Sequence, residues 1–212
     1  MEENIINYLN TAQEDLEYEK LIFIKYVDKN KNVLDIGGCM GVMSMILSQL
    51  TTKKVYVYEP NPISFNLLTQ NIKNNNIKNV IAHNYGIGNK FSETKIIYSH
   101  PENIGQTMLG VNKEQIKKSN GVKVDLFKLD DISVKNIGFI KIDVEGYELE
   151  VLRSGKNLLT NNEIVVAVEY HGFNINGKWK TTKSKVLNIM KKYKYNLIEE
   201  IGNNKLIFKN YE

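Results

Sequence analysis

The residues of this sequence that could most clearly take part in chemistry are an acid and the glycine-rich turn beside it. Residues 33–41 read VLDIGGCMG, so a short apolar strand runs directly into Gly37, Gly38 and Gly41. Turns of this kind usually bind phosphate on backbone N–H groups at a helix N-terminus. Asp35 stands two residues before Gly37, where it would repel a pyrophosphate. The D-x-G-x-x-x-G spacing therefore favours a ligand that has a cationic ammonium group and no phosphate.

A second acid, Glu59, follows the next apolar segment, residues 54–58 (KVYVY). A carboxylate at the end of a second strand can accept hydrogen bonds from both hydroxyls of a ribose. Because NAD sites use such an acid too, Glu59 alone does not identify the ligand. Together with Asp35 and the glycine spacing, it predicts S-adenosylmethionine, whose amino-acid moiety carries the ammonium.

Polar residues end each of the five segments that we expect to be the main strands. In an open parallel sheet, ligands bind beyond the carboxyl ends of the strands, so these residues are candidates for binding and catalysis. The five ends are Asp35 to Gly38, Glu59-Pro60-Asn61, Asn84-Tyr85-Gly86, Asp143 to Gly146 and Glu169-Tyr170-His171. Asn84 and Gly86 either lie near an adenine ring or only form a turn, and the sequence leaves both readings open.

The order of the elements predicts an α/β fold. Strand-like segments at 32–37, 54–60, 79–86, 137–146 and 163–171 alternate with helical segments at 42–50, 63–75, from about 147, and at 183–193. This alternation indicates right-handed βαβ units in a three-layer sandwich of about seven strands. Residues 195–201 and 204–210 predict an antiparallel terminal hairpin.

The same pattern predicts one main domain with two additions. Residues 1–30 form a helical N-terminal segment, because apolar residues recur at helical spacing within 12–27. Residues 31–212 form the domain itself. Its polar stretch at 90–131, with a strand-like run at either end, is an insertion in the loops of the sheet.

Composition excludes several classes of protein. The chain has 212 residues, 42% hydrophobic and 25% charged, which fits one globular domain, and its net charge of +4 is not gathered into a basic stripe with interleaved aromatics. We therefore expect no nucleic-acid partner. The single cysteine, Cys39, excludes an intrachain disulfide and is interpreted as a small apolar residue. With no signal-peptide pattern and no apolar run of roughly 20 residues, we expect no membrane insertion and a cytoplasmic location.

At this point the chain resembles a known family. The motifs VLDIGGCMGVMS, VYVYEPNP, HNYGIGN, HPENIGQTML, LDDI, GFIKIDVEGYELEVLRSG and VVAVEYH occur in the order and spacing of the FkbM-type methyltransferases. The resemblance runs from about residue 32 to residue 171, and IKIDVEGYELEVL is its most distinctive piece. It implies a Rossmann-like class I methyltransferase fold with strand order 3-2-1-4-5-7-6. It also implies S-adenosylmethionine as donor and a hydroxyl of a sugar or secondary metabolite as acceptor.

The resemblance also implies roles for individual residues. Asp35, Gly37, Gly41 and Glu59 hold the donor, and Asp143 faces its methyl group. Departures from the family are modest: Gly86 stands where relatives often carry alanine, and Asn89 where they often carry aspartate. With the neighbouring strand-end residues, the predicted cofactor site comprises Asp35, Gly37, Gly38, Gly41, Glu59, Pro60, Asn61, Asn84, Gly86 and Asp143. The predicted acceptor site comprises His100, Asn103, Gly105, Gln106, Glu145 and His171, of which Asn103 and Gly105 match a loop that lies over the active site in the family.

Transfer of a methyl group to a hydroxyl benefits from a general base or a metal that removes the proton. The catalytic candidates are Asp143, Glu169 and His171; the last two lie on the same side of an extended strand. These three could also bind a divalent ion, but we predict no metal. Alternative readings are that Glu145 caps the following helix, that His171 only bonds its turn and that His100 is simply exposed.

The sequence therefore predicts an S-adenosylmethionine-dependent O-methyltransferase acting on a small-molecule or glycan hydroxyl, with a sugar as the expected acceptor. Two alternatives stay open: a methyltransferase acting on nitrogen or nucleic acid, and a non-catalytic protein that binds S-adenosylmethionine. The absence of a D/N-P-P-Y motif disfavours amino-group methylation, and the intact glycine turn with Asp143 disfavours the non-catalytic reading.

Overall fold

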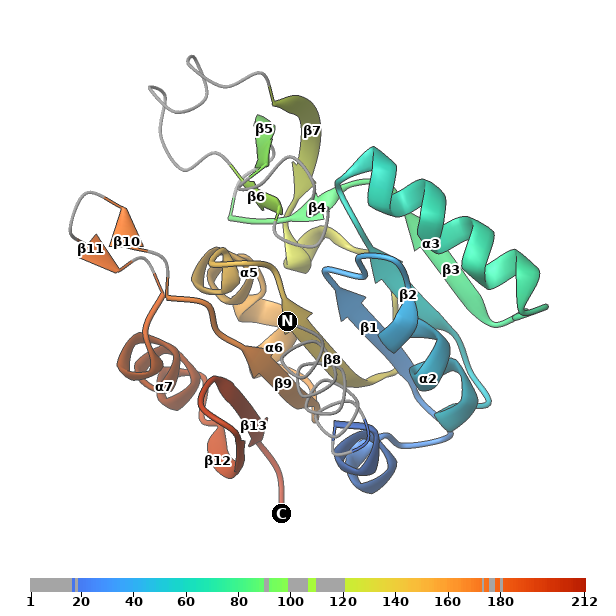
Figure 1. Cartoon of the computed structure of the whole chain (residues 1–212). Helices are drawn as coiled ribbons and strands as arrows, with labels where there is room; N and C mark the ends of the chain where they lie inside the picture. The colour runs from blue at the N-terminus through green and yellow to red at the C-terminus, as the bar shows by residue number, and fades with distance from the viewer. Residues whose placement is uncertain are drawn as a thin grey trace, which may run out of the picture.

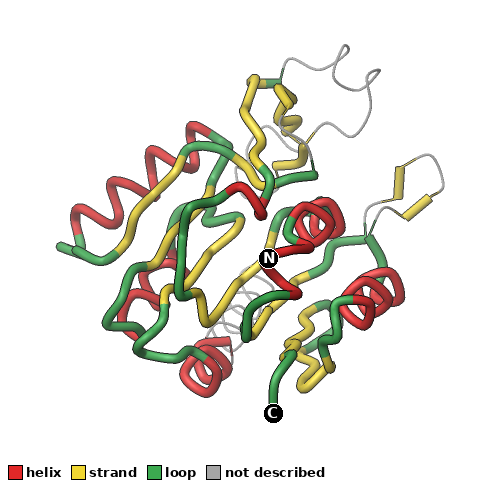
Figure 2. The backbone as a smooth tube through the Cα atoms, turned by 180° about the vertical axis from the view of Figure 1, so that it is seen from behind, coloured by secondary structure: helices red, strands yellow, loops and turns green. Residues whose placement is uncertain are grey.

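The fold is that of a computed structural model, which describes residues 17, 19–89, 92–98, 107–109, 121–172, 174, 175, 178, 179 and 181–212. Its centre is a seven-stranded sheet with helices on both faces (Figures 1 and 2). The strands of this sheet are β1 (Asn32–Ile36), β2 (Val55–Tyr58), β3 (Val80–His83), β8 (Ile137–Asp143), β9 (Val165–Glu169), β12 (Asn196–Ile201) and β13 (Lys205–Lys209).

The order of the strands is β12-β13-β9-β8-β1-β2-β3. Numbered only within this sheet and read from β3, it is 3-2-1-4-5-7-6, which confirms the expected order. The pairs among β3, β2, β1, β8 and β9 are parallel, whereas β13 is antiparallel to both β9 and β12. The predicted C-terminal hairpin is therefore also confirmed.

The helices follow the pattern that the sequence predicts, with a few additions. They are α2 (Val42–Leu50), α3 (Pro62–Asn74), α5 (Glu148–Ser154), α6 (Lys156–Thr160) and α7 (Lys183–Lys192), and the described N-terminal residues 19–26 are also helical. Helix α3 begins where Asn61 caps the backbone N–H of Ile63 and proline occupies the first turn. Helix α6 was not predicted, because five residues carry too little periodicity. No helix in the described part of the chain is long and apolar enough to cross a membrane.

Two apolar clusters, one on each face, hold the layers together. On one face the N-terminal helical residues Ile22 and Phe23 pack with Leu47 of α2 against Val33 and Phe139. The opposite face of the sheet packs against side chains of α5, α6 and α7, among them Leu152, Leu159 and Val186. Strand β8 has apolar residues on both faces, as expected for the central strand of a covered parallel sheet.

The strands of the predicted insertion form a second, small sheet together with β4 (Gly86–Ile87), which directly precedes it. These strands are β5 (Ser92–Tyr98), β6 (Thr107–Leu109) and β7 (Val122–Phe127), and the order in the sheet is β4-β7-β5-β6. Figure 1 shows it at one end of the main sheet, between α3 and the short hairpin of β10 (Asn174–Ile175) and β11 (Lys178–Trp179). The sequence predicts β5 and β7. It misses β4, β6 and the hairpin, which are too short to show an alternating pattern.

The register of the central strands aligns the charged residues in rows. Asp35 on β1 lies beside Lys141 on β8, and Asp143 lies beside Glu169 on β9. Because side chains alternate along a strand, Lys141 and Asp143 share a face of β8. This is the face that carries Phe139 and that the N-terminal helical residues cover. The carboxyl end of the sheet therefore places four charged side chains close together.

Close backbone contact between β1 and β8 depends on Gly37. Its φ is +90°, and a Cβ built on it would lie 1.8 Å from the carbonyl oxygen of Asp143. No side chain fits at that distance. Gly37 therefore lets the turn after β1 reach the end of β8, where the predicted donor and acceptor residues meet.

We predict that Gly37→Ala lowers the free energy of unfolding by about 2–4 kcal/mol, from overpacking of about 1–3 kcal/mol plus about 1 kcal/mol of left-handed strain. The matched control is Gly202→Ala, because Gly202 also has a positive φ, +54°, but nothing lies within 4 Å of its Cβ. This control should lose only about 1 kcal/mol. Denaturant unfolding measures both, and equal losses would show that the contact with Asp143 has no energetic weight.

Candidate active site

Glu59 is held in place by the two loops of the predicted donor side. Its Oε2 accepts the backbone N–H of Cys39 at 2.8 Å, and its Oε1 accepts that of Asn61, also at 2.8 Å. Burial raises the pKa of Glu59 to about 7, although both hydrogen bonds act to lower it. Each carboxylate oxygen has a second lone pair, so the group can still accept ribose hydroxyls. The residues present fit the predicted cofactor at this position.

Contacts within the protein leave little room for a side chain at the glycines of the turn. A Cβ on Gly38 would lie 2.1 Å from Cγ2 of Val57, and one on Gly41 would lie 3.1 Å from Cγ of Leu68. Gly41 also has a φ of +88° and precedes the first residue of α2. These contacts bring the turn down onto β2 and α3. Close approach of a ligand, which the sequence suggests as the reason for the glycines, stays a prediction.

The remaining predicted cofactor residues shape the loop after β2. Asn84 donates from its side chain to the carbonyl oxygens of Glu59 and Pro60, at 2.9 and 3.3 Å. A Cβ on Gly86 would lie 2.6 Å from Leu126 and 3.4 Å from Pro60. Both observations favour the local-turn reading of Asn84 and Gly86. Contact with an adenine ring stays a prediction for both.

Asp35 is completely buried behind the glycine turn. Its Oδ2 accepts a hydrogen bond from the hydroxyl of Ser44 in α2 at 2.5 Å, and its Oδ1 lies 3.6 Å from Nζ of Lys141. Burial raises its pKa, while Lys141 and Ser44 act to lower it. Asp35 thus fixes the start of α2 and pairs with a lysine. A direct contact between Asp35 and the ammonium of the donor stays a prediction.

Lys141 is the residue of the site that sequence reasoning missed. It is only 4% exposed, and its Nζ lies 3.2 Å from Oδ2 of Asp143 as well as 3.6 Å from Asp35. Burial acts to lower its pKa, but the two carboxylates more than compensate, so its pKa is raised and the lysine is charged. A lysine in an otherwise apolar strand, two residues before Asp143, was the signal that could have revealed it.

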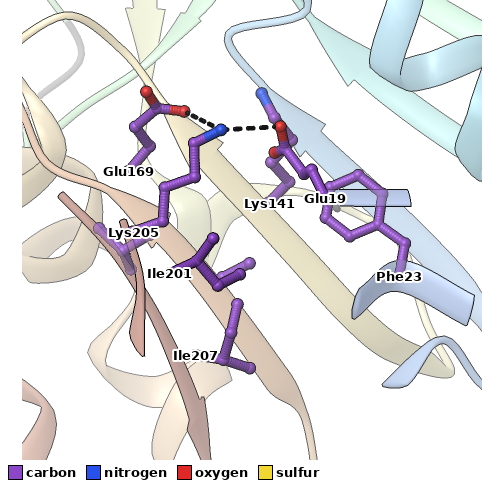
Figure 3. A pocket seen from close by; sticks show the side chains of 9 residues that line it. Glu19, Phe23, Lys141, Glu169, Ile201, Lys205 and Ile207 are labelled. Atoms are coloured by element: carbon purple, nitrogen blue, oxygen red, sulfur yellow. Dashed lines mark hydrogen bonds and ion pairs between the residues drawn. The ribbon is translucent and has the colours of Figure 1, made fainter. Parts of the chain in front are cut away.

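Glu169 is engaged by the C-terminal hairpin. Its Oε1 accepts a hydrogen bond from Asn204 at 3.2 Å, and its Oε2 lies 3.5 Å from Nζ of Lys205. Lys205 also pairs with Glu19 of the N-terminal helical segment at 2.9 Å, so it bridges two carboxylates (Figure 3). A cavity of about 10 Å³ lies here, beside Lys141. It has room for about one water molecule, so it is too small to hold the donor.

His171 lies among carboxylates at the edge of the sheet. Its Nδ1 is 3.4 Å from Oε1 of Glu148 and 3.8 Å from Oδ1 of Asp143, and its Nε2 is 3.6 Å from Oε1 of Glu169. Burial acts to lower its pKa, but the contact with Glu148 and the charges of Glu145 and Asp143 raise it to about 9. The structure thus brings all three catalytic candidates together.

Glu145 does not cap the following helix. It has a φ of +50° in the turn after β8, whereas Tyr147 is the N-cap of α5 and Glu148 accepts the backbone N–H of Gly146 at 2.7 Å. The capping alternative considered for Glu145 is therefore wrong, because the turn places it two residues too early. Burial raises the pKa of Glu145 to about 7, although nearby His171 acts to lower it.

Asp143, Glu145 and His171 offer ligand atoms that lie within 4.8 Å of one another. This spacing would admit a cation. The attraction between His171 and the carboxylates around it explains the same close spacing without a cation, so we assign no metal to the group. The predicted acceptor residues His100, Asn103, Gly105 and Gln106 lie outside the residues that the structure describes.

We predict that Lys141→Met lowers the free energy of unfolding by about 3–5 kcal/mol, because it leaves the carboxylate of Asp35 buried without a charged partner. The double variant Asp35→Asn/Lys141→Met should regain most of this loss, since no uncompensated charge remains. Denaturant unfolding measures both. The control is Lys25→Met, which breaks an exposed ion pair with Glu199 and should leave the unfolding midpoint nearly unchanged. A Lys141→Met protein as stable as the wild type would contradict the interpretation.

Two relatives with curated names match much of the chain. The hexuronic acid methyltransferase AglP of Haloferax volcanii is 29% identical over 154 residues, 71% of this chain and 60% of the relative. Methyltransferase 1 of Beauveria bassiana is 23% identical over 142 residues, 57% of either protein. The chain thus spans less than two thirds of the length of these relatives.

Solved structures share the fold. A methyltransferase FkbM from Methylobacillus flagellatus superposes with a TM-score of 0.58 at 18% identity, over 85% of this chain and 44% of that one. SMU.1697c from Streptococcus mutans, crystallised in complex with SAH, superposes with a TM-score of 0.52 at 15% identity, over 92% of this chain and 96% of that one. At these identities the likeness shows the fold alone.

The methyltransferase FkbM domain matches residues 35–197, which is well over half of the chain. These bounds include the glycine turn, Glu59, the acidic end of β8 and His171. The match agrees with the motifs and the strand order described above, and a methyltransferase domain of this family makes S-adenosylmethionine the cofactor. The chain belongs to the FkbM methyltransferase family.

Proposed function

We propose that this chain is an S-adenosylmethionine-dependent O-methyltransferase that acts on a hydroxyl of a small molecule or glycan, with a sugar as acceptor. The observation that carries the proposal is the meeting of two sets of residues at one edge of the sheet. The donor side has Glu59 and the glycine turn, and the neighbouring strand ends bring Asp143 and His171 together at 3.8 Å.

A hydroxyl acceptor agrees with the residues at the edge. An alcohol has a very high pKa, so a group that takes its proton accelerates transfer to oxygen. Asp143 is paired with Lys141 through Oδ2 and faces His171 with Oδ1, whereas both oxygens of Glu169 are engaged, by Asn204 and by Lys205. We therefore assign the acid–base role to His171 and Asp143, and an anchoring role for the hairpin to Glu169. The sugar acceptor is supported by the name of the Haloferax volcanii relative, a hexuronic acid methyltransferase.

The residues of the chain act mainly by alignment. Bound S-adenosylmethionine supplies an electrophilic methyl group, so the protein needs to hold an acceptor oxygen in line with it. Glu59 orients the donor ribose, Lys141 holds one oxygen of Asp143, and His171 faces the other. While the methyl group that the donor would supply is transferred to the acceptor oxygen, the proton of that hydroxyl would pass to Nε2 of His171.

The direct test is a transfer assay with methyl-labelled S-adenosylmethionine and a panel of acceptors. The panel contains nucleotide sugars, free uronic acids and oligosaccharides, with RNA and a lysine-rich peptide as the competing classes. The proposal predicts label on a sugar, with the methyl carbon bonded to oxygen in the NMR spectrum of the product. Label on RNA or on an amine would overturn it, and so would binding of S-adenosylmethionine without transfer to any acceptor of the panel.

We predict that Glu59→Gln weakens binding of S-adenosylmethionine about 10- to 100-fold, because a hydrogen bond to a charged group contributes about 1.5–3 kcal/mol. Titration calorimetry measures this without an acceptor. The control is Glu150→Gln, which changes a carboxylate that pairs with Arg153 at the surface and should leave the affinity unchanged. An unchanged affinity in Glu59→Gln would remove Glu59 from the donor site.

We predict that kcat/KM rises with pH, about tenfold per unit below pH 9, because His171 must be neutral to accept a proton and its pKa is about 9. The carboxylates that face it are Asp143 on β8, Glu145 in the turn, Glu148 on α5 and Glu169 on β9. His171→Gln should lose both the rise and most of the activity. His83→Gln is the control and should keep the rise, since His83 stacks on Tyr58. A flat profile in the wild type would exclude His171 as the base.

A further inference from the structure

The side chain of Glu148 is more deeply buried than a carboxylate at the start of a helix needs to be. It is completely inaccessible to solvent in the first turn of α5, where Oε1 accepts the backbone N–H of Gly146 at 2.7 Å. Its Oε2 has no hydrogen-bond partner among the described residues. Burial of a carboxylate costs several kcal/mol unless a partner compensates it.

The position in the helix does not by itself explain this burial. Glu150 lies in the same first turn, but its side chain is 22% exposed and pairs with Arg153. A carboxylate gains from the helix dipole at either position without leaving water. What distinguishes Glu148 from Glu150 is therefore the group that Glu148 contacts.

The cationic neighbour of Glu148 is His171. Oε1 of Glu148 lies 3.4 Å from Nδ1 of the imidazole, closer than Oδ1 of Asp143 at 3.8 Å. The second ring nitrogen, Nε2, points toward Glu169, 3.6 Å away. The side chain of His171 is 21% exposed, so solvent still reaches part of the ring.

We propose that Glu148 is a positioning residue that fixes the ring orientation and the tautomer of His171. A carboxylate that accepts the Nδ1 proton of an imidazole leaves Nε2 as the lone-pair nitrogen, which is how histidine bases and metal-bound histidines are oriented in many proteins. Nε2 would then take the proton of the acceptor hydroxyl, while Glu148 keeps its contact with Nδ1–H and stabilises the imidazolium. The proposal rests on the proposed role of His171 as the base.

Thr181 strengthens the support behind Glu148. Its hydroxyl, which is completely buried, donates to the carbonyl oxygen of Gly146 at 3.1 Å. The backbone of Gly146 is therefore held on one side by Thr181 and on the other by Glu148. This leaves the Glu148 carboxylate little freedom to turn away from His171.

The test is nitrogen NMR of the ligand-free protein with labelled histidines. The sequence contains three histidines, so His171 is assigned by the loss of one signal in His171→Gln. In spectra recorded above pH 9, where the ring is neutral, we expect the wild type to carry its proton on Nδ1. Glu148→Gln should shift it toward the Nε2–H tautomer and should lower kcat at least about tenfold without changing the affinity for S-adenosylmethionine. The matched control is Glu150→Gln, which should change neither.

Two results would overturn the proposal: an Nε2–H tautomer in the wild type, or an unchanged tautomer in Glu148→Gln. Asp143→Asn identifies the competing partner, since a tautomer that follows this substitution would assign the orientation to Asp143 instead. The wild-type spectrum decides the question even if Glu148→Gln does not fold. Because the spectrum needs neither donor nor acceptor, failure of methyl transfer and failure of this proposal are distinguishable.

Discussion

The ion pairs of Lys141 are the interaction on which the rest of the site depends. This buried lysine lies between Asp35, at the end of β1, and Asp143, at the end of β8. Without it, the completely buried carboxylate of Asp35 would lie near that of Asp143 with no charge to compensate it, and it could not remain ionised at low cost. The close contact of Gly37 with the backbone of Asp143 brings the same two strand ends together. The charge of Lys141 and the absence of a side chain at Gly37 thus hold the glycine turn after β1 against the acidic end of β8.

The residues of the proposed site come from both faces of the sheet and lie together at the carboxyl ends of its strands. Asp143 and Glu169 come from the face covered by the N-terminal helical residues, and Glu148 belongs to α5 on the opposite face. His171, just beyond the end of β9, lies between them and contacts all three. Lys205 and Asn204 of the hairpin hold Glu169, so the antiparallel end of the sheet also contributes. The irregular ends of the strands therefore carry the residues of the proposed site, and the regular layers position them.

Much of this could be predicted from the sequence, because the features concerned are local. The glycine turn, the strand that contains Asp35, helix α2 and the terminal hairpin follow from short-range patterns, and the strand order follows from the family motifs. Lys141 and Glu148 could not be predicted in this way. Their roles depend on the register between β1 and β8 and on the distance from α5 to the end of β9, and neither is visible in a linear pattern. The alternative that Glu145 caps the helix fails for a related reason, since Glu145 and Gly146 both have a positive φ and form a turn before the N-cap residue Tyr147.

The central claim is that the edge formed by β1, β2, β8 and β9 is one site that binds S-adenosylmethionine beside an acid–base group. A crystal structure of the protein with S-adenosylhomocysteine tests it most directly. The account predicts both ribose hydroxyls within hydrogen-bond distance of Glu59, and the sulfur closer to Asp143 and His171 than to any residue of the C-terminal hairpin. A ligand bound elsewhere, or a Glu59 carboxylate that contacts only the backbone of Cys39 and Asn61 in the complex, would contradict it.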